Sequence, residues 1–415
     1  MRCNYPGLGG NAIFNSASEL GSLHASSRPQ RMPSSLILWI KHLAAVLFRR
    51  TGAMRTRQAS HAGSWYEASP TWLSSDLDKW LAQVPDRLDG DSLPVPGARV
   101  IIAPHAGYSY SGPCAAWAYK ALDLRGAKRV FVLGPSHTYY LRGCALTSFG
   151  KYRTPFGDLV VDREVTEKLD ETGDFQEIPD YSDVEEHSLE MHLPYLWKRL
   201  QQTFGNDSSR FPLIVPILVG DLAVKQEKHF GQLLAPYLKD PENAFIISSD
   251  FCHWGKRFHY RPIYYADGVL RNIDAEVDKV ARGETAAVIK TNGNANGKRG
   301  AEQEPAPPGI LKIAPISIVK PDTPIHEFIK TLDDLSIDAV KTGVHDKFFK
   351  AIHDSGNTVC GRHPIGVVMA GLEALAKDGL EEGKGRFEFV QYQRSNLVSD
   401  VKDFSVSYAS AYAII

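Results

Sequence analysis

Three short apolar runs in the chain each stop at a small or kinked segment that carries a histidine. The histidines are His105, His137 and His253, and the residues before each are consecutive, apolar and often β-branched. Runs of this kind predict buried strands of a largely parallel sheet that is covered on both faces. In open α/β sheets, ligands bind just beyond the carboxyl ends of the strands. We therefore expect the three imidazoles to converge on one crevice.

Segments with helical and with strand periodicity alternate along the rest of the chain. Leu73, Leu77 and Leu81 recur at helical spacing and predict a helix that ends near Val84. This alternation predicts an α/β fold with a mixed or largely parallel sheet flanked by helices. The other predicted elements are helices at 114–122, 163–172, 183–200, 325–352 and 367–377, a helix ending at 238, a hairpin within 145–163, and strands at 211–220, 386–392 and 405–412.

Two segments differ in composition from the rest. Residues 1–53 hold one acidic residue, Glu19, among several arginines and serines. Such a leader is typical of a transit peptide, or it is an upstream translation outside the folded protein, since Met54 directly precedes the first globular sequence. Residues 282–323 are rich in Asn, Gly and Pro and predict a low-complexity surface insertion. We expect a single α/β domain over residues 54–415.

The overall composition excludes several classes of partner. The 415 residues are 43% hydrophobic and 23% charged, with a formal net charge of -1. This near-neutral balance gives no basic surface for nucleic acid, and the apolar run at 36–48 is too short and too charged to span a membrane. The five cysteines are scattered without a C-x-x-C pair, which favours a reducing compartment. We expect a cytoplasmic protein that also enters the nucleus, or a mitochondrial one if residues 1–53 are a genuine transit peptide.

Metal binding is the first chemistry that these residues suggest. Imidazole and thiolate are good ligands for iron, copper or zinc. His105 and His137 each follow a predicted strand and a proline, and Cys360 lies in a polar loop. Asp250 and His253 offer a carboxylate and an imidazole for proton transfer. The residues alone leave alternatives open: hydrogen-bonded strand-end histidines, a turn cap for the aspartate, or a cysteine nucleophile with a histidine base.

A second pair of histidines lies in one predicted helix. His187 and His192 are five residues apart, which places them roughly 140° apart around a helix. They therefore cannot chelate one ion from the same helix, as the two histidines of zinc proteases do. We expect His187 and Glu190 instead to support a site from behind its ligands.

Six motifs, in order along almost the whole globular chain, resemble those of the Memo family, the mediators of receptor-tyrosine-kinase-driven cell motility. The resemblance implies an α/β fold similar to that of the class III extradiol dioxygenases, whose non-haem iron is held by two histidines and a carboxylate. The motifs are Ser-His-Ala-Gly-Ser-Trp-Tyr at 60–66, Ala-Pro-His-Ala-Gly-Tyr at 103–108, Gly-Pro-Ser-His at 134–137, Glu-His-Ser-Leu-Glu-Met-His-Leu-Pro at 186–194, Ser-Ser-Asp-Phe-Cys-His-Trp at 248–254 and Cys-Gly-Arg-His-Pro-Ile-Gly at 360–366.

The resemblance also implies a set of site residues. Two histidines and a cysteine, His105, His137 and Cys360, match the ligands of an iron or copper ion in Memo-like proteins. His253 matches the acid/base position of the dioxygenases, with Asp250 beside it. The implied pocket is lined by His61, Trp65, Tyr66, Tyr108, Trp254, His187 and Glu190.

Three functions follow from this resemblance and from the residues. The first is a metal-binding protein with a redox or metal-homeostasis role, linked to cell motility and signalling. The second is a non-catalytic adaptor whose aromatic pocket binds a phosphotyrosine peptide or another signalling protein. The third is an active metal-dependent dioxygenase with a small-molecule substrate. A thiolate in place of the carboxylate is a softer ligand, which argues against ring cleavage and leaves open whether the protein is an enzyme.

Overall fold

The computed structural model describes residues 55–88, 90–264, 270–272, 274 and 323–415. These residues belong to one compact unit, Arg49–Ile415. The predicted extension at 1–53 lies outside the described residues. The predicted insertion at 282–323 also lies outside them, except for its last residue.

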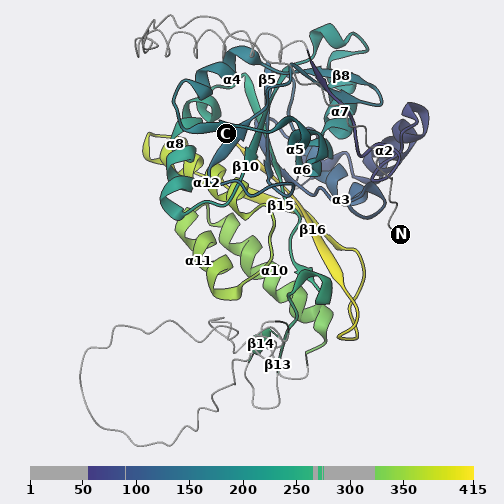
Figure 1. Cartoon of the computed structure of the whole chain (residues 1–415), viewed down its shortest axis with the longest axis vertical. Helices are drawn as coiled ribbons and strands as arrows, with labels where there is room; N and C mark the ends of the chain where they lie inside the picture. The colour runs from purple at the N-terminus through teal and green to yellow at the C-terminus, as the bar shows by residue number, and fades with distance from the viewer. Residues whose placement is uncertain (1–54, 89, 265–269, 273, 275–322) are drawn as a thin grey trace, which may run out of the picture. The chain divides into compact units, whose positions relative to one another are not determined.

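A mixed sheet, with nine strands among the described residues, forms the centre of this unit (Figure 1). Its four central strands are parallel and lie in the order β4 (Ala98–Ala103), β11 (Asn243–Ser248), β5 (Arg129–Pro135) and β10 (Leu213–Val219). All four coincide with predicted apolar runs. The predicted buried parallel strands are therefore confirmed.

Antiparallel strands extend this parallel centre on both sides. Next to β4 lies β16 (Ser405–Ile414), which pairs with β15 (Phe387–Arg394) and β12 (His253–Trp254). Next to β10 lies the antiparallel strand β6 (Cys144–Leu146). The edge strand β9 (Phe175–Glu177) pairs with β6 in parallel. The sheet is thus mixed, and the predicted fold class is confirmed.

Side chains of the central strands alternate between two hydrophobic cores. In β11, Ala244 and Ile246 pack into one core, whereas Phe245 and Ile247 pack into the other. This alternation follows from the two-residue period of a strand and explains why each central strand is apolar throughout. The sheet therefore needs helices on both of its faces.

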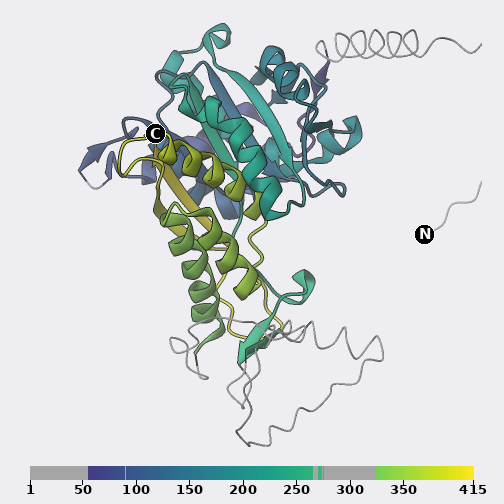
Figure 2. The same cartoon turned by 90° about the vertical axis from the view of Figure 1, so that its left-hand side faces the viewer.

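One core is closed by α2 (Pro70–Gln83), α3 (Tyr108–Ala121) and α7 (Leu193–Phe204). The opposite core is closed by helices from the middle and the end of the chain, of which α8 and α12 lie side by side (Figures 1 and 2). The helices of this second layer are α4 (Arg163–Asp170), α8 (Val224–Lys239), α10 (Ile325–Lys341), α11 (His345–Ser355) and α12 (Arg362–Lys377).

The close contact between α8 and α12 depends on glycine. A Cβ atom on Gly231 of α8 would lie 2.7 Å from the backbone nitrogen of Gly371 in α12. Such a distance is far below van der Waals contact, so the two backbones can approach only where both side chains are absent. This contact holds α12 against α8, and α12 begins two residues after Cys360.

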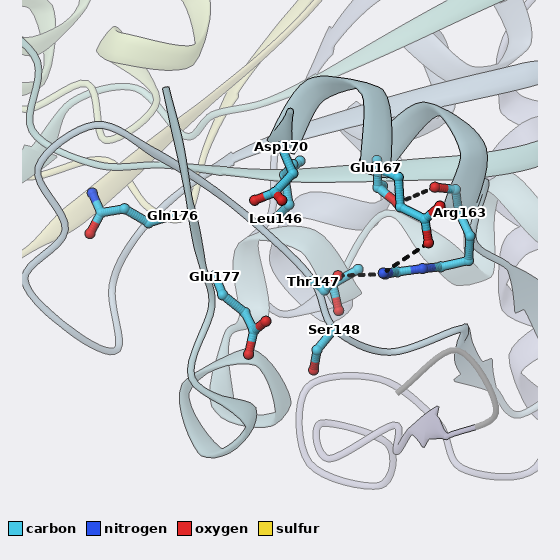
Figure 3. A pocket seen from close by; sticks show the side chains of 9 residues that line it. Leu146, Thr147, Ser148, Arg163, Glu167, Asp170, Gln176 and Glu177 are labelled. Carbon is cyan, nitrogen blue, oxygen red and sulfur yellow. Dashed lines mark hydrogen bonds and ion pairs between the residues drawn. The ribbon is translucent and has the colours of Figure 1, made fainter. Parts of the chain in front are cut away.

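Short elements complete the description. The predicted hairpin is confirmed, since β7 and β8 pair through a turn at 154–157. Between α4 and the sheet edge, a recess of about 30 Å³ remains beside Arg163 and Thr147, room for about one water molecule (Figure 3). The short strands are β1 (Thr56–Arg57), β2 (Arg87–Leu88), β3 (Asp91–Ser92), β7 (Lys151–Thr154), β8 (Gly157–Val160), β13 (Pro262–Tyr264) and β14 (Leu270–Asn272).

Several helix boundaries differ from the prediction. The single helix predicted at 325–352 is divided into α10 and α11 by residues 342–344. The helices α3 and α12 both begin five or six residues before the predicted starts, at Tyr108 and Arg362. In both cases the sequence before the predicted start holds glycine and proline, which favour a loop locally. Tertiary packing of α3 and α12 against the sheet outweighs that local preference.

The helix predicted at 183–200 is divided into α5 (Asp180–Glu185), α6 (His187–Glu190) and α7. The first division lies at Glu186, whose backbone is extended and whose carboxylate accepts the backbone N–H of Ser188. A side chain that caps its own following turn ends one helix and starts the next. This division places His187 at the first position of α6.

Among the described residues, no helix combines the length and apolarity that a membrane span requires.

Candidate metal centre

The central strands bring two of the predicted ligands together. Strand β11 is hydrogen-bonded to both β4 and β5 in parallel. His105 follows β4 by two residues, and His137 follows β5 by two residues. Their ring centroids are 5.3 Å apart. The expectation that these strand ends meet at one edge of the sheet is confirmed for this pair.

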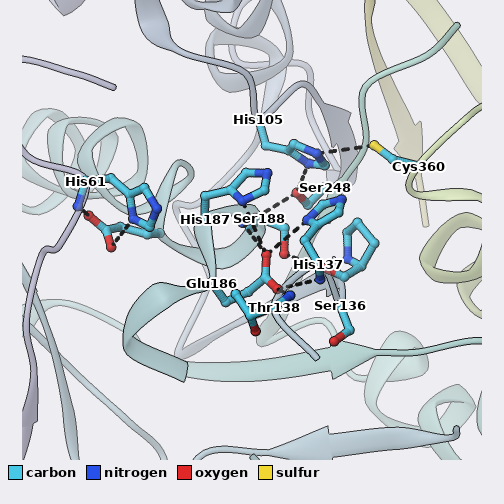
Figure 4. A network of polar contacts seen from close by, with 12 residues as sticks. His61, His105, Ser136, His137, Thr138, Glu186, His187, Ser188, Ser248 and Cys360 are labelled. Carbon is cyan, nitrogen blue, oxygen red and sulfur yellow. Dashed lines mark hydrogen bonds and ion pairs between the residues drawn. The ribbon is translucent and has the colours of Figure 1, made fainter. Parts of the chain in front are cut away.

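A third imidazole joins the pair from α6. The ring of His187 stacks on that of His137 at a centroid distance of 4.4 Å and lies 5.4 Å from that of His105. One nitrogen from each of the three rings lies within 4.8 Å of the other two (Figure 4). The sequence placed His187 only in the pocket, because it predicted one continuous helix. His192, in contrast, contacts the Tyr119 hydroxyl with its Nδ1 atom at 2.7 Å.

Ser248, at the end of β11, fixes the tautomer of His105. The Ser248 hydroxyl donates its only hydrogen to the Ser188 carbonyl at 2.7 Å. Its oxygen therefore accepts from the Nδ1 atom of His105, which lies 2.6 Å away. The proton of neutral His105 is thus on Nδ1, and the lone pair is on Nε2. Burial, together with the neighbouring imidazoles, keeps the pKa of His105 well below its ordinary value.

Glu186 fixes His137 in the same way. Its carboxylate accepts the backbone N–H of His137 at 2.7 Å and lies 3.0 Å from the Nδ1 atom of the same residue. Burial alone would raise the pKa of Glu186, but the contacts with His137 and the charge interaction with His187 lower it to about 2. A carboxylate accepts from Nδ1–H, which leaves the Nε2 lone pair of His137 available.

The same carboxylate lies 3.7 Å from the Nδ1 atom of His187. Burial is the main reason why the pKa of His187 is lowered to about 3, and the nearby His137 ring lowers it further. The ring centroids of His187 and Trp65 lie 4.5 Å apart. At neutral pH, His187 and His105 are therefore uncharged and can donate nitrogen lone pairs to a cation.

Cys360 lies at the His105 corner of the cluster. Its Sγ atom is 3.2 Å from Nε2 of His105 and accepts the backbone N–H of Asp250 at 3.2 Å. Burial and the charge of Asp250 raise the pKa of this thiol well above its ordinary value. A bound cation has the opposite effect, because coordination favours the thiolate.

Asp250 and His253 lie beyond the end of β11. The Asp250 carboxylate accepts the backbone N–H of His105 at 2.9 Å, and burial raises the pKa of this carboxyl to about 7. Nδ1 of His253 lies 2.9 Å from the Phe251 carbonyl and 3.2 Å from the Thr358 carbonyl. Carbonyls only accept, so the proton is on Nδ1, and Nε2 of His253 is a proton acceptor. Their roles in acid/base chemistry stay a prediction.

Glu190 accepts hydrogen bonds from several residues around His61. It is fully buried and accepts from the backbone N–H of His61 at 2.9 Å, from the Tyr66 hydroxyl at 2.7 Å and from the Arg57 guanidinium at 2.6 Å. Burial would raise the pKa of Glu190, but the contacts with His61, Arg57 and Tyr66 lower it to about 2. Arg57 itself is fully buried and also pairs with Asp183 at 3.2 Å.

The remaining predicted pocket residues lie in different surroundings. Trp65 is 37% exposed and meets the His61 ring edge-on at 5.4 Å. Tyr108 is buried, and its hydroxyl donates to the Met191 carbonyl at 2.7 Å. Trp254 is fully buried in a separate hydrophobic cluster. Trp65 is thus the pocket aromatic that faces both the cluster and the solvent.

Three residues of this site were missed at the sequence level. Ser248 and Glu186 are the first residues of the motifs at 248–254 and 186–194, and this membership is the signal that would have found them. Arg57 has no such signal, because it lies in a two-residue strand before the first motif. Its role follows only from contacts with residues more than 120 positions away.

The donor set fits a transition-metal ion. Iron, copper and zinc bind imidazole and thiolate, with metal–nitrogen distances of about 2.0–2.1 Å for zinc. Donor atoms around such an ion lie roughly 3–4 Å apart by this geometry, so a group within 4.8 Å needs only a small closure. His105 and His137 would hold the ion, with His187 or Cys360 as the third ligand.

The fold and the site define an α/β protein with a cluster of three histidines beyond the carboxyl ends of its central strands. The model of the Memo-like protein family matches residues 57–412, and the chain belongs to this family. It is 38% identical over 362 residues to Protein MEMO1 of Danio rerio, which covers 87% of this chain and 98% of the relative. Protein MEMO1 of Homo sapiens is 37% identical over 354 residues, covering 85% and 96%. Protein memo-1 homolog of Caenorhabditis elegans is 34% identical over 362 residues, covering 87% and 83%.

Proposed function

We propose that this Memo-like protein binds one iron or copper ion at the strand-end cluster and serves a redox or metal-homeostasis role linked to cell motility and signalling. One observation carries the proposal. Ser248 and Glu186 occupy the Nδ1 side of His105 and His137, so both Nε2 lone pairs are left for a cation. Histidine ligands of metals are oriented in this way by a hydrogen bond to the other ring nitrogen.

Iron or copper, when bound, would supply one-electron redox chemistry and Lewis acidity. The residues of the chain would position the ligands and accept protons. Asp250 holds the backbone of His105 in place, and His253 presents an unprotonated Nε2 atom that can accept a proton. Trp65 packs against the ring of His187 at a centroid distance of 4.5 Å.

The third ligand distinguishes two versions of the proposal. With Cys360, the donor set is two nitrogens and one sulfur, which favours copper(I) or an iron centre with altered redox behaviour. With His187, it is three nitrogens. The family resemblance supports Cys360, whereas the distances between ligand atoms support His187. A site that uses both would be four-coordinate.

Elemental analysis of purified protein tests the proposal. After reconstitution with iron(II) or copper(I), we expect about one ion per chain, and His137→Ala should lose it. Cys360→Ala and His187→Ala should differ in their effect. Replacement of the true third ligand should lower the affinity for the metal ion at least about tenfold. The control is His229→Ala, because this histidine is half-exposed and pairs with Asp174 elsewhere. A wild-type protein that retains neither iron nor copper after reconstitution would contradict the proposal.

The same experiment separates the alternatives. If neither metal binds, the adaptor function gains, in which the surface around Trp65 holds a phosphotyrosine peptide of a signalling partner. If metal binds, oxygen consumption with catechols distinguishes a dioxygenase from a protein that stores or buffers metal. The cytoplasmic location stays a prediction.

A further inference from the structure

The guanidinium of Arg57 is fully buried, and each of its nitrogens donates hydrogen bonds. A guanidinium is always charged and carries its N–H donors in a rigid plane. Such a group can hold several segments of the chain in one fixed arrangement. Its acceptors here are the carbonyls of Gln58, Asp183, Val184 and Glu186 and the carboxylates of Asp183 and Glu190.

Three of these carbonyls lie at the division between α5 and α6. In a continuous helix, each carbonyl accepts the backbone N–H four residues later. Here the carbonyls accept from the guanidinium instead, at 2.8 Å for Asp183, 3.0 Å for Val184 and 2.8 Å for Glu186. A positive charge is also favourable at the C-terminus of a helix. Arg57 therefore stabilises the division from outside, whereas the Glu186 side chain caps α6 from inside.

The same guanidinium also holds the other end of α6. Its Nη1 atom donates to the carboxylate of Glu190 at 2.6 Å, and Glu190 is the last residue of α6. Glu190 in turn accepts the backbone N–H of His61 at 2.9 Å, in the loop that carries Trp65. The short helix α6 is thus fixed at both ends by Arg57, and His187 is its first residue.

His187 depends on this fixed backbone more than the other two imidazoles of the cluster do. Ser248 and Glu186 each hold one of those two rings by a contact of 2.6 or 3.0 Å with its Nδ1 atom (Figure 4). Among the described residues, His187 has no such anchor, because the Glu186 carboxylate lies 3.7 Å from its Nδ1 atom, beyond hydrogen-bond distance. The position of α6 therefore determines where the His187 ring lies.

We propose that Arg57 is the positioning residue that presents His187 to the cluster, and that it thereby sets the preference of the site between iron and copper. With this anchor, three imidazole nitrogens lie within 4.8 Å of one another, a donor set that suits iron. Without it, His105, His137 and Cys360 remain, and their softer donor set favours copper(I). The positioning is a property of the metal-free chain, whereas the metal preference rests on the proposed function.

The variant Arg57→Lys tests the positioning in the metal-free full chain. An ammonium keeps the charge in the buried network, but it lacks the planar fork and cannot replace all the contacts with α5 and α6. In NMR spectra, the ring contact between His187 and Trp65, which are 4.5 Å apart in the wild type, should be lost. The ring signals of His192, which contacts a tyrosine hydroxyl of α3, should stay unchanged. A retained contact between His187 and Trp65 would overturn the proposal.

Arg99→Lys is the matched control, since Arg99 is partly buried and also donates to backbone carbonyls, at the start of β4. It should leave the contact of His187 unchanged, and an equal loss in both variants would overturn the proposal. Where Arg57→Lys fails to fold, Arg57→Ala decides. Millimolar guanidinium ion should restore the folded chain and the contact, whereas methylammonium ion, which has the charge without the fork, should not. Equal restoration by both ions, or by neither, would overturn the role of the guanidinium.

The metal preference has its own measurement. Competition with chelators gives the affinities of the wild type and of Arg57→Lys for iron(II) and for copper(I). The affinity for iron(II) should fall at least about tenfold. The affinity for copper(I) should fall less, because Cys360 and His105 stay in contact. Equal losses for both ions would overturn the role in metal preference. Failure of the proposed function appears separately, as a wild type that binds neither ion, and the NMR test of positioning does not depend on it.

Discussion

Two groups among the described residues each combine several histidines with one buried carboxylate, and the carboxylate has a different place in each. In the strand-end cluster, Glu186 lies behind the imidazoles on the Nδ1 side of His137. In the helical layer, Glu227 lies between His345 and His363 and contacts both rings at 2.6 Å. The first arrangement leaves nitrogen lone pairs directed at one another, whereas the second uses ring nitrogens for contact with the carboxylate.

The two groups also differ in charge. Burial lowers the pKa of His187, with help from His137, so this residue of the cluster is neutral. Burial also opposes a proton on His345, but the hydrogen bonds with Glu227 and Asp346 raise its pKa. The comparison teaches that a carboxylate behind histidines leaves ring nitrogens free for the cation proposed above, whereas a carboxylate between them contacts the ring nitrogens itself. We call the second group the Glu227 clamp, comprising Glu227, His345 and His363.

The largest effect is expected from removal of the central carboxylate of the Glu227 clamp. Glu227→Leu leaves the buried His345 without its counter-ion, and we expect a loss of about 3–5 kcal/mol of unfolding free energy. Urea denaturation measures this loss. Metal content per folded chain should not change. A loss below about 1 kcal/mol, the size expected for an exposed ion pair such as Lys128–Glu242, would show that the clamp is not structural.

The corresponding change in the cluster should affect binding more than folding. Glu186→Gln keeps the size of the side chain but removes the charge that orients His137, and we expect metal affinity to fall about 10–100-fold. Competition with a chelator measures this affinity. Glu185→Gln is the neighbouring control, because Glu185 is exposed. Equal affinities of the two variants would contradict the orienting role of Glu186.

A smaller effect is expected at the other orienting residue. Ser248→Ala removes the acceptor on the Nδ1 side of His105 without removing a charge. Metal affinity should fall about tenfold, the lower limit for such partners. The ¹⁵N shifts of the His105 ring should also change from the Nδ1–H tautomer to a mixture. An unchanged tautomer would mean that another contact fixes the ring, and Ser64→Ala, in an exposed loop, controls for the substitution itself.

The strand ends were predictable because their signal is local. A consecutive β-branched run that ends at Pro or Gly reports burial on both faces, and burial determines which strands become central. The order of the strands then brings His105 and His137 together. Sequence motifs placed Cys360 next to this pair, and the structure puts its sulfur 3.2 Å from His105.

The position of His187 was not predictable from periodicity. It depends on the end of α5 at Glu186, whose side chain caps the next turn and also holds His137 from a distant strand. Local propensity therefore favours one helix, and a contact between residues 49 positions apart divides it. The Glu227 clamp is a similar case, since its three members come from α8, α11 and α12.

The smallest expected effect is the pH dependence of the Glu227 clamp. The raised pKa of His345 means that its contribution is complete below its ordinary value near 6.5 and is lost as pH rises through the folded pKa. The lowered pKa of Glu227 means that its contribution is complete above its ordinary value near 4.5 and is lost as pH falls through the folded pKa. The clamp should thus be strongest between these two pH values.

The difference in unfolding free energy between the wild type and His345→Gln measures this window. We expect the difference to shrink by on the order of 1 kcal/mol as pH rises above the folded pKa of His345, since one pKa unit corresponds to about 1.4 kcal/mol. His353→Gln is the control, because that side chain is largely exposed on the same helix. A difference that grows with pH would reverse the sign and show that His345 is neutral in the folded protein, like His187 and His105, in which case the position of the carboxylate would not distinguish the two groups.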